Sequence, residues 1–143
     1  MASKHIVCPQ CHRVNRVPEA RFADRPKCGA CKAPLFNGHP VELDASSFDA
    51  HVEHSGIPVV ADFWAPWCGP CRMLAPVFVQ VAAELTGRAQ LVKVNTEAAP
   101  GLASRFGIRS IPTLVLFRNG KEVRRVAGAL DAQRLKAWIG QGG

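Results

Sequence analysis

The sequence predicts an α/β domain preceded by a small domain that cannot build a core of its own. From Val41 onward, apolar runs of strand length alternate with segments of helical periodicity. Before that point, two cysteine pairs and scattered arginines replace such runs, and a turn-rich stretch at residues 37–40 separates the two parts. We therefore expect a small domain at residues 1–38 and a larger one at residues 39–143.

The larger domain is predicted to begin with a short strand at residues 41–43, followed by a helix capped by Ser46 or Ser47. The next apolar run, residues 58–64, is nearly continuous, as expected of a strand that is covered on both faces. Asp62 interrupts this run, and an unpaired carboxylate there would be costly to bury. It is therefore a candidate functional residue.

A long helix is predicted to start at or just before Cys71, because the apolar residues that follow recur at helical spacing. Pro76 is expected to kink this helix, since proline removes a backbone donor and clashes with the preceding turn. Residues 91–95 are predicted to form another strand, and residues 100–106 a short helix.

The end of the chain is predicted to form a hairpin and a helix. Residues 113–118 and 121–127 flank Asn119-Gly120, which is the strongest short signal for a two-residue hairpin turn. Asp131 is placed to cap the final helix. The predicted order of elements in the larger domain is therefore βαβαβαββα.

The composition is that of a soluble globular protein, with 48% hydrophobic and 20% charged residues and no low-complexity run. No apolar run is long enough to cross a membrane, and the first residues lack the apolar stretch of a secretory signal. We therefore expect a cytoplasmic protein with no membrane partner, and we expect it to act as a monomer. In that compartment, metal binding and catalysis explain six cysteines better than structural disulfides do.

The net charge of +7 is concentrated at the start of the chain, where residues 1–40 carry seven Lys and Arg against two acidic residues. Nucleic-acid binding by this segment is an alternative function that the charge leaves open. It is disfavoured because only Phe22 and Phe36 are available to stack on bases.

Cys68 and Cys71 lie where the buried strand meets the long helix, and this placement predicts a redox dithiol. The thiolate of Cys68 would face the unpaired N–H groups and the positive end of the helix dipole, so its pKa should fall. Cys71, one turn further along and more shielded, suits the resolving thiol. Gly69 allows close backbone approach and Pro70 has no donor to lose at a helix start. The alternatives are one half of a metal site or structural thiols.

Residues 61–71, Ala-Asp-Phe-Trp-Ala-Pro-Trp-Cys-Gly-Pro-Cys, resemble the active-site segment of the thioredoxin family. Residues 106–113 and the pair Gly128-Ala129 resemble further thioredoxin segments, in the right order. The resemblance implies a thioredoxin fold, with a central mixed β-sheet flanked by helices. It also implies a thiol-disulfide oxidoreductase, a protein-disulfide reductase that acts on disulfides in client proteins. The opposite direction, oxidation of substrates, depends on the redox poise and stays open.

The same resemblance implies that a flavin-dependent thioredoxin reductase regenerates the dithiol, so the chain itself needs no organic cofactor. It makes Asp62 the proton acceptor that helps Cys71 attack the mixed disulfide. Burial should raise the pKa of Asp62 toward neutral pH, and Lys93 matches a family lysine that tempers this rise. Without the resemblance, Asp62 could equally be a carboxylate satisfied by hydrogen bonds, and Lys93 a solvated strand residue.

Pro112 precedes a predicted strand, and the thioredoxin family has a cis peptide bond at this position. A trans proline that simply opens the strand is the alternative. With a cis bond, the Ile111 backbone would lie beside the dithiol, where an extended client chain could pair with it. The resemblance thus predicts an apolar client-binding surface around Cys68, made of Trp67, Gly69, Pro70, Ile111, Pro112, Gly128 and Ala129.

The first domain contains Cys8-x-x-Cys11 and, after sixteen intervening residues, Cys28-x-x-Cys31, which is the spacing of a zinc ribbon. Four thiolates close a tetrahedron around one Zn²⁺, so the site is predicted to be structural and to supply folding free energy. His5 or His12 as a ligand is the alternative.

Segments 7–9, 15–18 and 27–28 extend the resemblance to bacterial thioredoxins that carry such a zinc domain. What this domain contributes to function is open, and redox sensing by its thiolates is one possibility.

Overall fold

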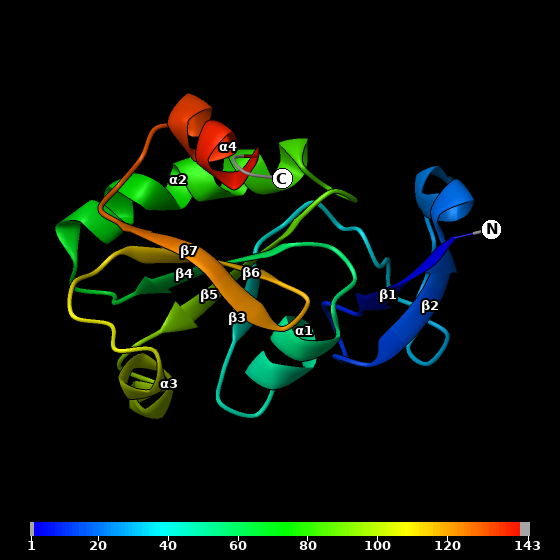
Figure 1. Cartoon of the computed structure of the whole chain (residues 1–143), viewed down its shortest axis with the longest axis horizontal. Helices are drawn as coiled ribbons and strands as arrows, with labels where there is room; N and C mark the ends of the chain where they lie inside the picture. The colour runs from blue at the N-terminus through cyan, green and yellow to red at the C-terminus, as the bar shows by residue number, and fades with distance from the viewer. Residues whose placement is uncertain (1, 141–143) are drawn as a thin grey trace.

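A computed structural model describes residues 2–140, and the outer ends of the two predicted domains, Met1 and residues 141–143, lie outside the described part. A five-stranded sheet lies between two layers of helices, and a two-stranded sheet lies apart at one end (Figure 1). The elements of the larger domain are β3 (Val41–Leu43), α1 (Phe48–His54), β4 (Val59–Trp64), α2 (Gly69–Glu84), β5 (Gln90–Asn95), α3 (Pro100–Arg105), β6 (Thr113–Arg118), β7 (Lys121–Ala127) and α4 (Ala132–Gly140).

The large sheet is mixed, with strand order β3-β5-β4-β6-β7. β3, β5 and β4 are parallel, whereas β6 is antiparallel to β4 and β7 is antiparallel to β6. Both the mixed sheet and the predicted order βαβαβαββα are confirmed. β4 is the central strand, which explains why residues 58–64 are almost continuously apolar.

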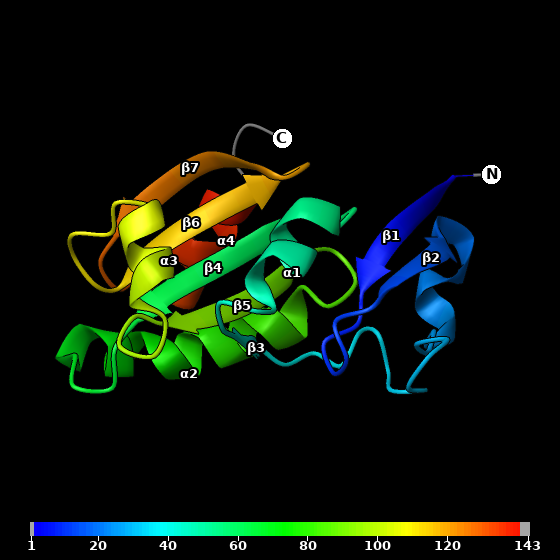
Figure 2. The same cartoon turned by 90° about the horizontal axis from the view of Figure 1, so that it is seen from below.

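Each face of the sheet has its own core, covered by two helices (Figure 2). On one face, Phe48 of α1 packs with Phe63, Phe106 and Phe117. On the other face, Leu74 and Phe78 of α2 and Leu135 and Ile139 of α4 cover the sheet; the strand residues in this core are Val60, Leu91, Leu114 and Leu116. The residues of β4 alternate between the two cores, so Asp62 points to the face of α2 and α4.

The predicted hairpin turn and one of the two predicted helix caps are confirmed. Asn119 and Gly120 both have positive φ, 53° and 79°, as a type I′ hairpin turn requires. Asp131 caps α4 as predicted, since its Oδ1 accepts a hydrogen bond from the N–H of Arg134 at 2.8 Å. The predicted cap of α1 is wrong: the Ser47 side chain caps nothing, and Asp44 Oδ1 accepts the N–H groups of Ser46 and Ser47 instead.

Pro76 lies inside α2, which continues for two further turns to Glu84. Within residues 2–140, no helix has the length and apolar character needed to cross a bilayer.

The first domain consists of strands β1 (Ser3–Val7) and β2 (Val14–Pro18), which pair antiparallel, and the short 3₁₀ helix η1 (Glu19–Asp24). Its apolar cluster is small and contains one residue of the larger domain, Ile57, which is 6% exposed. The other buried members are Ile6, Cys8, Val17, Cys28 and Leu35. The domain therefore depends on its neighbour to close its core, in line with the thin core that the sequence predicts.

The first domain docks onto the C-terminal end of α1 and the loop that leads into β4. The N–H of Gly56 donates to the carbonyl of His5 at 2.7 Å. A Cβ at Gly56 would lie 3.0 Å from the backbone N and O of His5, so a larger residue would force the two backbones apart by a few tenths of an ångström. In both views the first domain lies beside α1, far from the N-terminal end of α2 (Figures 1 and 2).

Candidate active site and metal centre

Cys68 and Cys71 lie where the loop after β4 enters α2, and the structure joins them in a disulfide. Cys68 is the N-cap residue of α2, and its Sγ accepts a hydrogen bond from the N–H of Cys71 at 3.2 Å. The first N–H groups of a helix have no partner within the helix. This donor and the helix dipole therefore favour negative charge on Cys68 Sγ once the disulfide is reduced.

Exposure does not separate the two cysteines, although the sequence suggested that Cys71 would be more shielded. Each is 4% exposed in the disulfide form. Their positions differ instead, because Cys68 caps the helix and Cys71 lies within its first turn. Among residues 2–140, the one group of three or more potential metal ligands does not include either cysteine, which argues against the metal half-site alternative.

Asp62 is buried in β4, with 1% of its surface exposed. Neither carboxyl oxygen has a hydrogen-bond partner among the described residues, so no protein group satisfies this carboxyl. Burial raises the pKa of Asp62 to about 7, and the positive charge of Lys93 opposes this rise. Lys93 is paired with Asp62 in the register of β4 and β5, as its assigned role requires.

The predicted client-binding residues surround Cys68 from three segments. Cys68 Sγ lies 3.6 Å from the carbonyl oxygen of Ile111, and the Ile111–Pro112 peptide bond is cis. The N–H of Gly128 donates to the carbonyl of Pro112 at 2.8 Å, and φ of Gly128 is +99°, which favours glycine. Trp67 is 65% exposed beside the disulfide.

The remaining residues of this surface differ in exposure. Gly69, Pro70 and Ala129 are exposed, Ile111 and Gly128 are half-buried and Pro112 is buried. A Cβ at Gly69 would meet nothing within 4 Å, so the space at this residue is open to an incoming chain. Ile111 packs against the two cysteines together with Ala65 and Trp64. Pro112 thus supports the surface from below rather than forming part of it.

Two residues near the dithiol were missed by the sequence analysis. Met73, on the first turns of α2, is 71% exposed, and its helical spacing gave it no role beyond predicting the helix. Glu42, on β3, accepts a hydrogen bond from Trp64 Nε1 at 3.0 Å. No sequence signal points to this contact, because the two residues are far apart along the chain.

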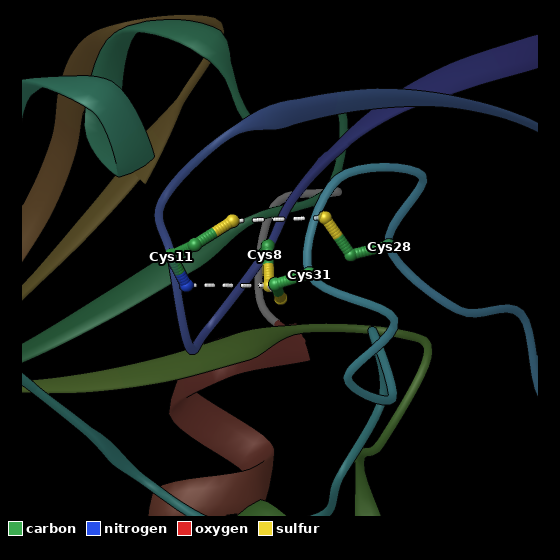
Figure 3. Close-up of side chains that lie close together, drawn as sticks. All are labelled: Cys8, Cys11, Cys28 and Cys31. Atoms are coloured by element: carbon green, nitrogen blue, oxygen red, sulfur yellow. Dashed lines mark hydrogen bonds between the residues drawn. The ribbon is translucent and has the colours of Figure 1, made fainter.

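The sulfur atoms of Cys8, Cys11, Cys28 and Cys31 lie within 4.8 Å of one another (Figure 3). Two of the separations are 3.6 Å, Cys8 to Cys31 and Cys11 to Cys28, and none of the four is in a disulfide. Zn–S bonds of about 2.3 Å in a tetrahedron place sulfurs about 3.8 Å apart. The four cysteines therefore fit a zinc ion.

Backbone N–H groups are directed at the first cysteine of each pair. Cys8 Sγ accepts from the N–H of Gln10 at 3.3 Å and of Cys11 at 3.4 Å, and Cys28 Sγ accepts from the N–H of Ala30 at 3.4 Å. These donors suit thiolates, which a metal requires.

Asn15 connects the two cysteine turns. Its Nδ2 donates to the carbonyl of Arg13 at 3.1 Å and lies 3.5 Å from Cys28 Sγ, while its Oδ1 accepts from the N–H of Gly29 at 2.9 Å. The N–H of Cys31 and then the Asn15 amide lower the pKa of Cys28 to about 6. A single side chain thus orients both halves of the cluster.

His12 is not directed at the cluster. Its Nδ1 lies 2.9 Å from Nε2 of His51 on α1, and the two rings pack edge to face. His51 is 1% exposed, and burial, then the neighbouring His12, lower its pKa to about 4. The alternative of His12 as a ligand is therefore not supported, and the ring instead joins the two domains.

Comparisons with known proteins agree with this geometry. Residues 39–141 match the family model described as Thioredoxin, and residues 7–33 match the model described as Thioredoxin 2, N-terminal. Among curated relatives, "Thioredoxin C-3" of Corynebacterium nephridii is 45% identical over 136 residues, covering 95% of this chain and 93% of the relative. "Thioredoxin 1" of a Nostoc species is 53% identical over 94 residues, covering 66% of this chain and 88% of the relative.

A solved structure of a mutant thioredoxin from Halobacterium salinarum superposes with a TM-score of 0.66 at 38% identity, covering 71% of this chain and 88% of that one. The Thioredoxin family model covers residues 39–141, the part of the chain that carries the Cys68–Cys71 disulfide, and the first of these relatives covers 95% of the chain. The chain belongs to the thioredoxin family, as a thiol-disulfide oxidoreductase with an N-terminal domain of the thioredoxin 2 zinc-ribbon type.

Proposed function

We propose that the chain reduces disulfides in client proteins, with Cys68 as the nucleophile and Cys71 as the resolving thiol. The observation that carries these roles is the hydrogen bond from the N–H of Cys71 to Cys68 Sγ at the start of α2. The Cys68 thiolate attacks a client disulfide, forms a mixed disulfide and releases one client sulfur as a thiolate. Cys71 then gives its proton to Asp62 and attacks Cys68 Sγ, which breaks the bond to the client, releases the second client sulfur as a thiolate and closes the Cys68–Cys71 disulfide.

The client-binding surface supports proteins rather than small molecules as substrates. Trp67 and Pro70 are exposed, the space above Gly69 is open, and the Ile111 carbonyl lies beside the reacting sulfur. An extended client backbone can pair with the edge at Ile111 while apolar side chains contact Trp67. By family resemblance, thioredoxin reductase regenerates the dithiol with electrons from its flavin.

We further propose that Cys8, Cys11, Cys28 and Cys31 hold one structural Zn²⁺, and that the chain divides into domains at residues 38 and 39. Four cysteine ligands leave no open position for catalysis, so the metal would stabilise the fold of the first domain. A dithiol reductase and free zinc-binding thiolates both need a reducing compartment, which supports a cytoplasmic location.

The roles of the two cysteines are tested by single substitutions. Cys68→Ser is expected to abolish disulfide reduction, because no nucleophile remains. Cys71→Ser is expected to accumulate mixed disulfides with clients, since attack proceeds but resolution does not. Trapped complexes are counted on non-reducing gels after exposure to a model protein disulfide. Equal trapping by both variants would overturn the assignment.

The metal assignment is tested with the same proteins. Elemental analysis is expected to find one zinc per chain in the parent protein and in the Cys68→Ser variant. Cys8→Ser and Cys28→Ser are expected to lose it, because three thiolates hold zinc more weakly than four. If zinc instead disappears from the Cys68→Ser variant, the active-site pair is a ligand and both assignments fail.

A further inference from the structure

Three charged side chains occupy paired positions on three neighbouring strands next to the dithiol. In the register of the sheet, Glu42 of β3 is paired with Lys93 of β5, and Lys93 is paired with Asp62 of β4. Paired residues on adjacent parallel strands point to the same face of a sheet. This face is the one that α2 covers, and Cys71 lies at the start of that helix.

The Trp64 indole lies between the first two of these charges. Trp64 is two residues beyond Asp62 on β4, so it lies on the same face. Its Nε1 donates to Glu42 Oε1 at 3.0 Å, and the Lys93 ammonium lies 4.5 Å from the centre of its ring. Among the ion pairs of residues 2–140, none joins Lys93 to Asp62. Lys93 is therefore held against the indole rather than against the buried carboxyl.

Among residues 2–140, the other elements packed around Asp62 present no further charge to it. On β6 the paired residue is Leu114, and α4 contributes Leu135 and Ile139 to this face. On α2 the buried titratable group is Cys71, while Arg72 is exposed and donates to the carbonyl of Pro66.

Besides burial, two groups of opposite charge therefore shift the pKa of Asp62. Lys93 lowers the pKa of Asp62 and Glu42 raises it.

We propose that Glu42 is a positioning residue of the dithiol reaction, which anchors the Trp64 indole and offsets the charge of Lys93, so that Asp62 accepts the proton of Cys71. This inference rests on the proposed role of Asp62. In the resolving step, the proton leaves Cys71 Sγ for an Asp62 oxygen as the new bond to Cys68 Sγ forms, and the bond from Cys68 Sγ to the client sulfur breaks, so that the client leaves as a thiolate. An uncompensated Lys93 would stabilise the ionised carboxyl and make it a weaker base.

The variants separate the two parts of this role. Glu42→Gln removes the charge but keeps an oxygen that accepts from Trp64 Nε1. Glu42→Ala removes both. Glu53→Gln, on the exposed surface of α1, is the matched control for loss of one carboxylate elsewhere. Because Glu42 is itself exposed, its variants are expected to fold, which near-ultraviolet circular dichroism checks.

Two readouts follow Asp62 directly. Carboxyl carbon NMR measures its titration midpoint, and stopped-flow kinetics between pH 5 and 9 measures the rate at which the mixed disulfide is resolved. In Glu42→Gln we expect the titration midpoint of Asp62 and the midpoint of the rate against pH to fall by about half to one pH unit. A shift of this size is expected for loss of one charge at an exposed neighbour. Glu42→Ala should shift both midpoints at least as far, and Glu53→Gln should leave them unchanged.

The outcomes distinguish this inference from the function on which it rests. One outcome is that Asp62→Asn removes the rise of the resolution rate with pH while Glu42→Gln leaves the midpoint of that rise unchanged. In that case the role of Glu42 is wrong and that of Asp62 stands. If the midpoints shift in Glu42→Ala but not in Glu42→Gln, the proposal is also overturned, because the charge of Glu42 would then have no effect. If Asp62→Asn leaves the rise intact, Asp62 is not the proton acceptor and both assignments fall.

Discussion

Asp62 is costly for stability, and the chemistry proposed for it explains why a carboxyl lies at this position. Its carboxyl is buried without a hydrogen-bond partner among the described residues, and its pKa is raised to about 7, chiefly by burial. Below that pH a proton keeps the side chain neutral and the cost is small. Above it the folded protein contains a buried negative charge, which is the form that can accept a proton from Cys71.

Asp62 should make the unfolding free energy depend on pH. Because the folded state binds the Asp62 proton more tightly than the unfolded state, stability is lost as pH rises from about 4 through about 7. Asp62→Asn should therefore raise the unfolding free energy by up to about 4 kcal/mol at pH 8 and by little at pH 4. Urea denaturation at both pH values measures this difference. An equal gain at both would show that the charge is not the cause.

At the scale of elements, the dithiol helix and the hairpin follow local rules that the sequence displays. Cys68 precedes a helix start, Asn119-Gly120 occupies positions that need positive φ, and Asp131 caps α4. Ser47 is the N-cap residue of α1 and has the right residue type, but its hydroxyl exchanges hydrogen bonds with Asp44 instead of accepting a helix N–H. The sequence shows two suitable polar side chains but not which partner each one takes.

The strands of the first domain could not be predicted, because β1 and β2 lack the alternation of a buried strand and are held beside a cysteine cluster. In this region Asn15 is the residue that connects the elements. From β2 it bonds to both cysteine turns, through the carbonyl of Arg13 and the N–H of Gly29.

The hydrogen bonds of Asn15 to both cysteine turns should strengthen metal binding. Asn15→Ala should weaken zinc binding about tenfold, the lower end of the effect of losing a hydrogen-bond partner of a metal ligand. Asn15→Asp keeps the acceptor for Gly29 but cannot donate to Cys28 Sγ, and it adds negative charge beside the thiolates. Its zinc affinity should be at least as low, measured by competition with a chromogenic chelator. Full affinity in Asn15→Asp would show that only the Gly29 contact matters.

At the scale of the whole molecule, the two functional centres lie at opposite ends of β4. Ile57, which closes the core of the first domain, precedes this strand, and Cys68 follows it. Six residues of β-strand span about 20 Å. Events at the four-cysteine cluster therefore reach the dithiol only through the body of the larger domain.

The third prediction uses this separation. A chain shortened to begin at Pro40 should fold and keep reductase activity toward a generic disulfide, because the dithiol surface is intact. In the full chain, Ile57→Ala should cost about 2 to 4 kcal/mol of unfolding free energy, as for other buried large-to-small changes. In the shortened chain the same change should cost well under half as much, since the residues that bury Ile57 are gone.

Urea denaturation of the four proteins gives the comparison. Similar losses in both backgrounds would mean that Ile57 is buried by the larger domain itself. An inactive but folded shortened chain would instead show that the first domain takes part in catalysis, against the division of labour proposed here.

The candidate site was largely predictable because its residues are close in sequence or match a known family. The cysteine spacings point to both centres without any structure. Glu42, Ile57 and the contact between His12 and His51 were not predictable, since each depends on which distant segments meet in the folded chain. Residues that make such contacts look like ordinary surface or core positions when the sequence is read along its length.

The close approach at Gly56 sets a rule for transplanting the first domain. A recipient domain needs a glycine where the backbone meets His5, an apolar side chain at the next position, and a partner for His12 on the first helix. A thioredoxin with alanine at the first of these positions would push the graft away by its Cβ alone. Joining the two coding sequences is therefore not enough, and the receiving surface has to be rebuilt at three positions before the graft can dock.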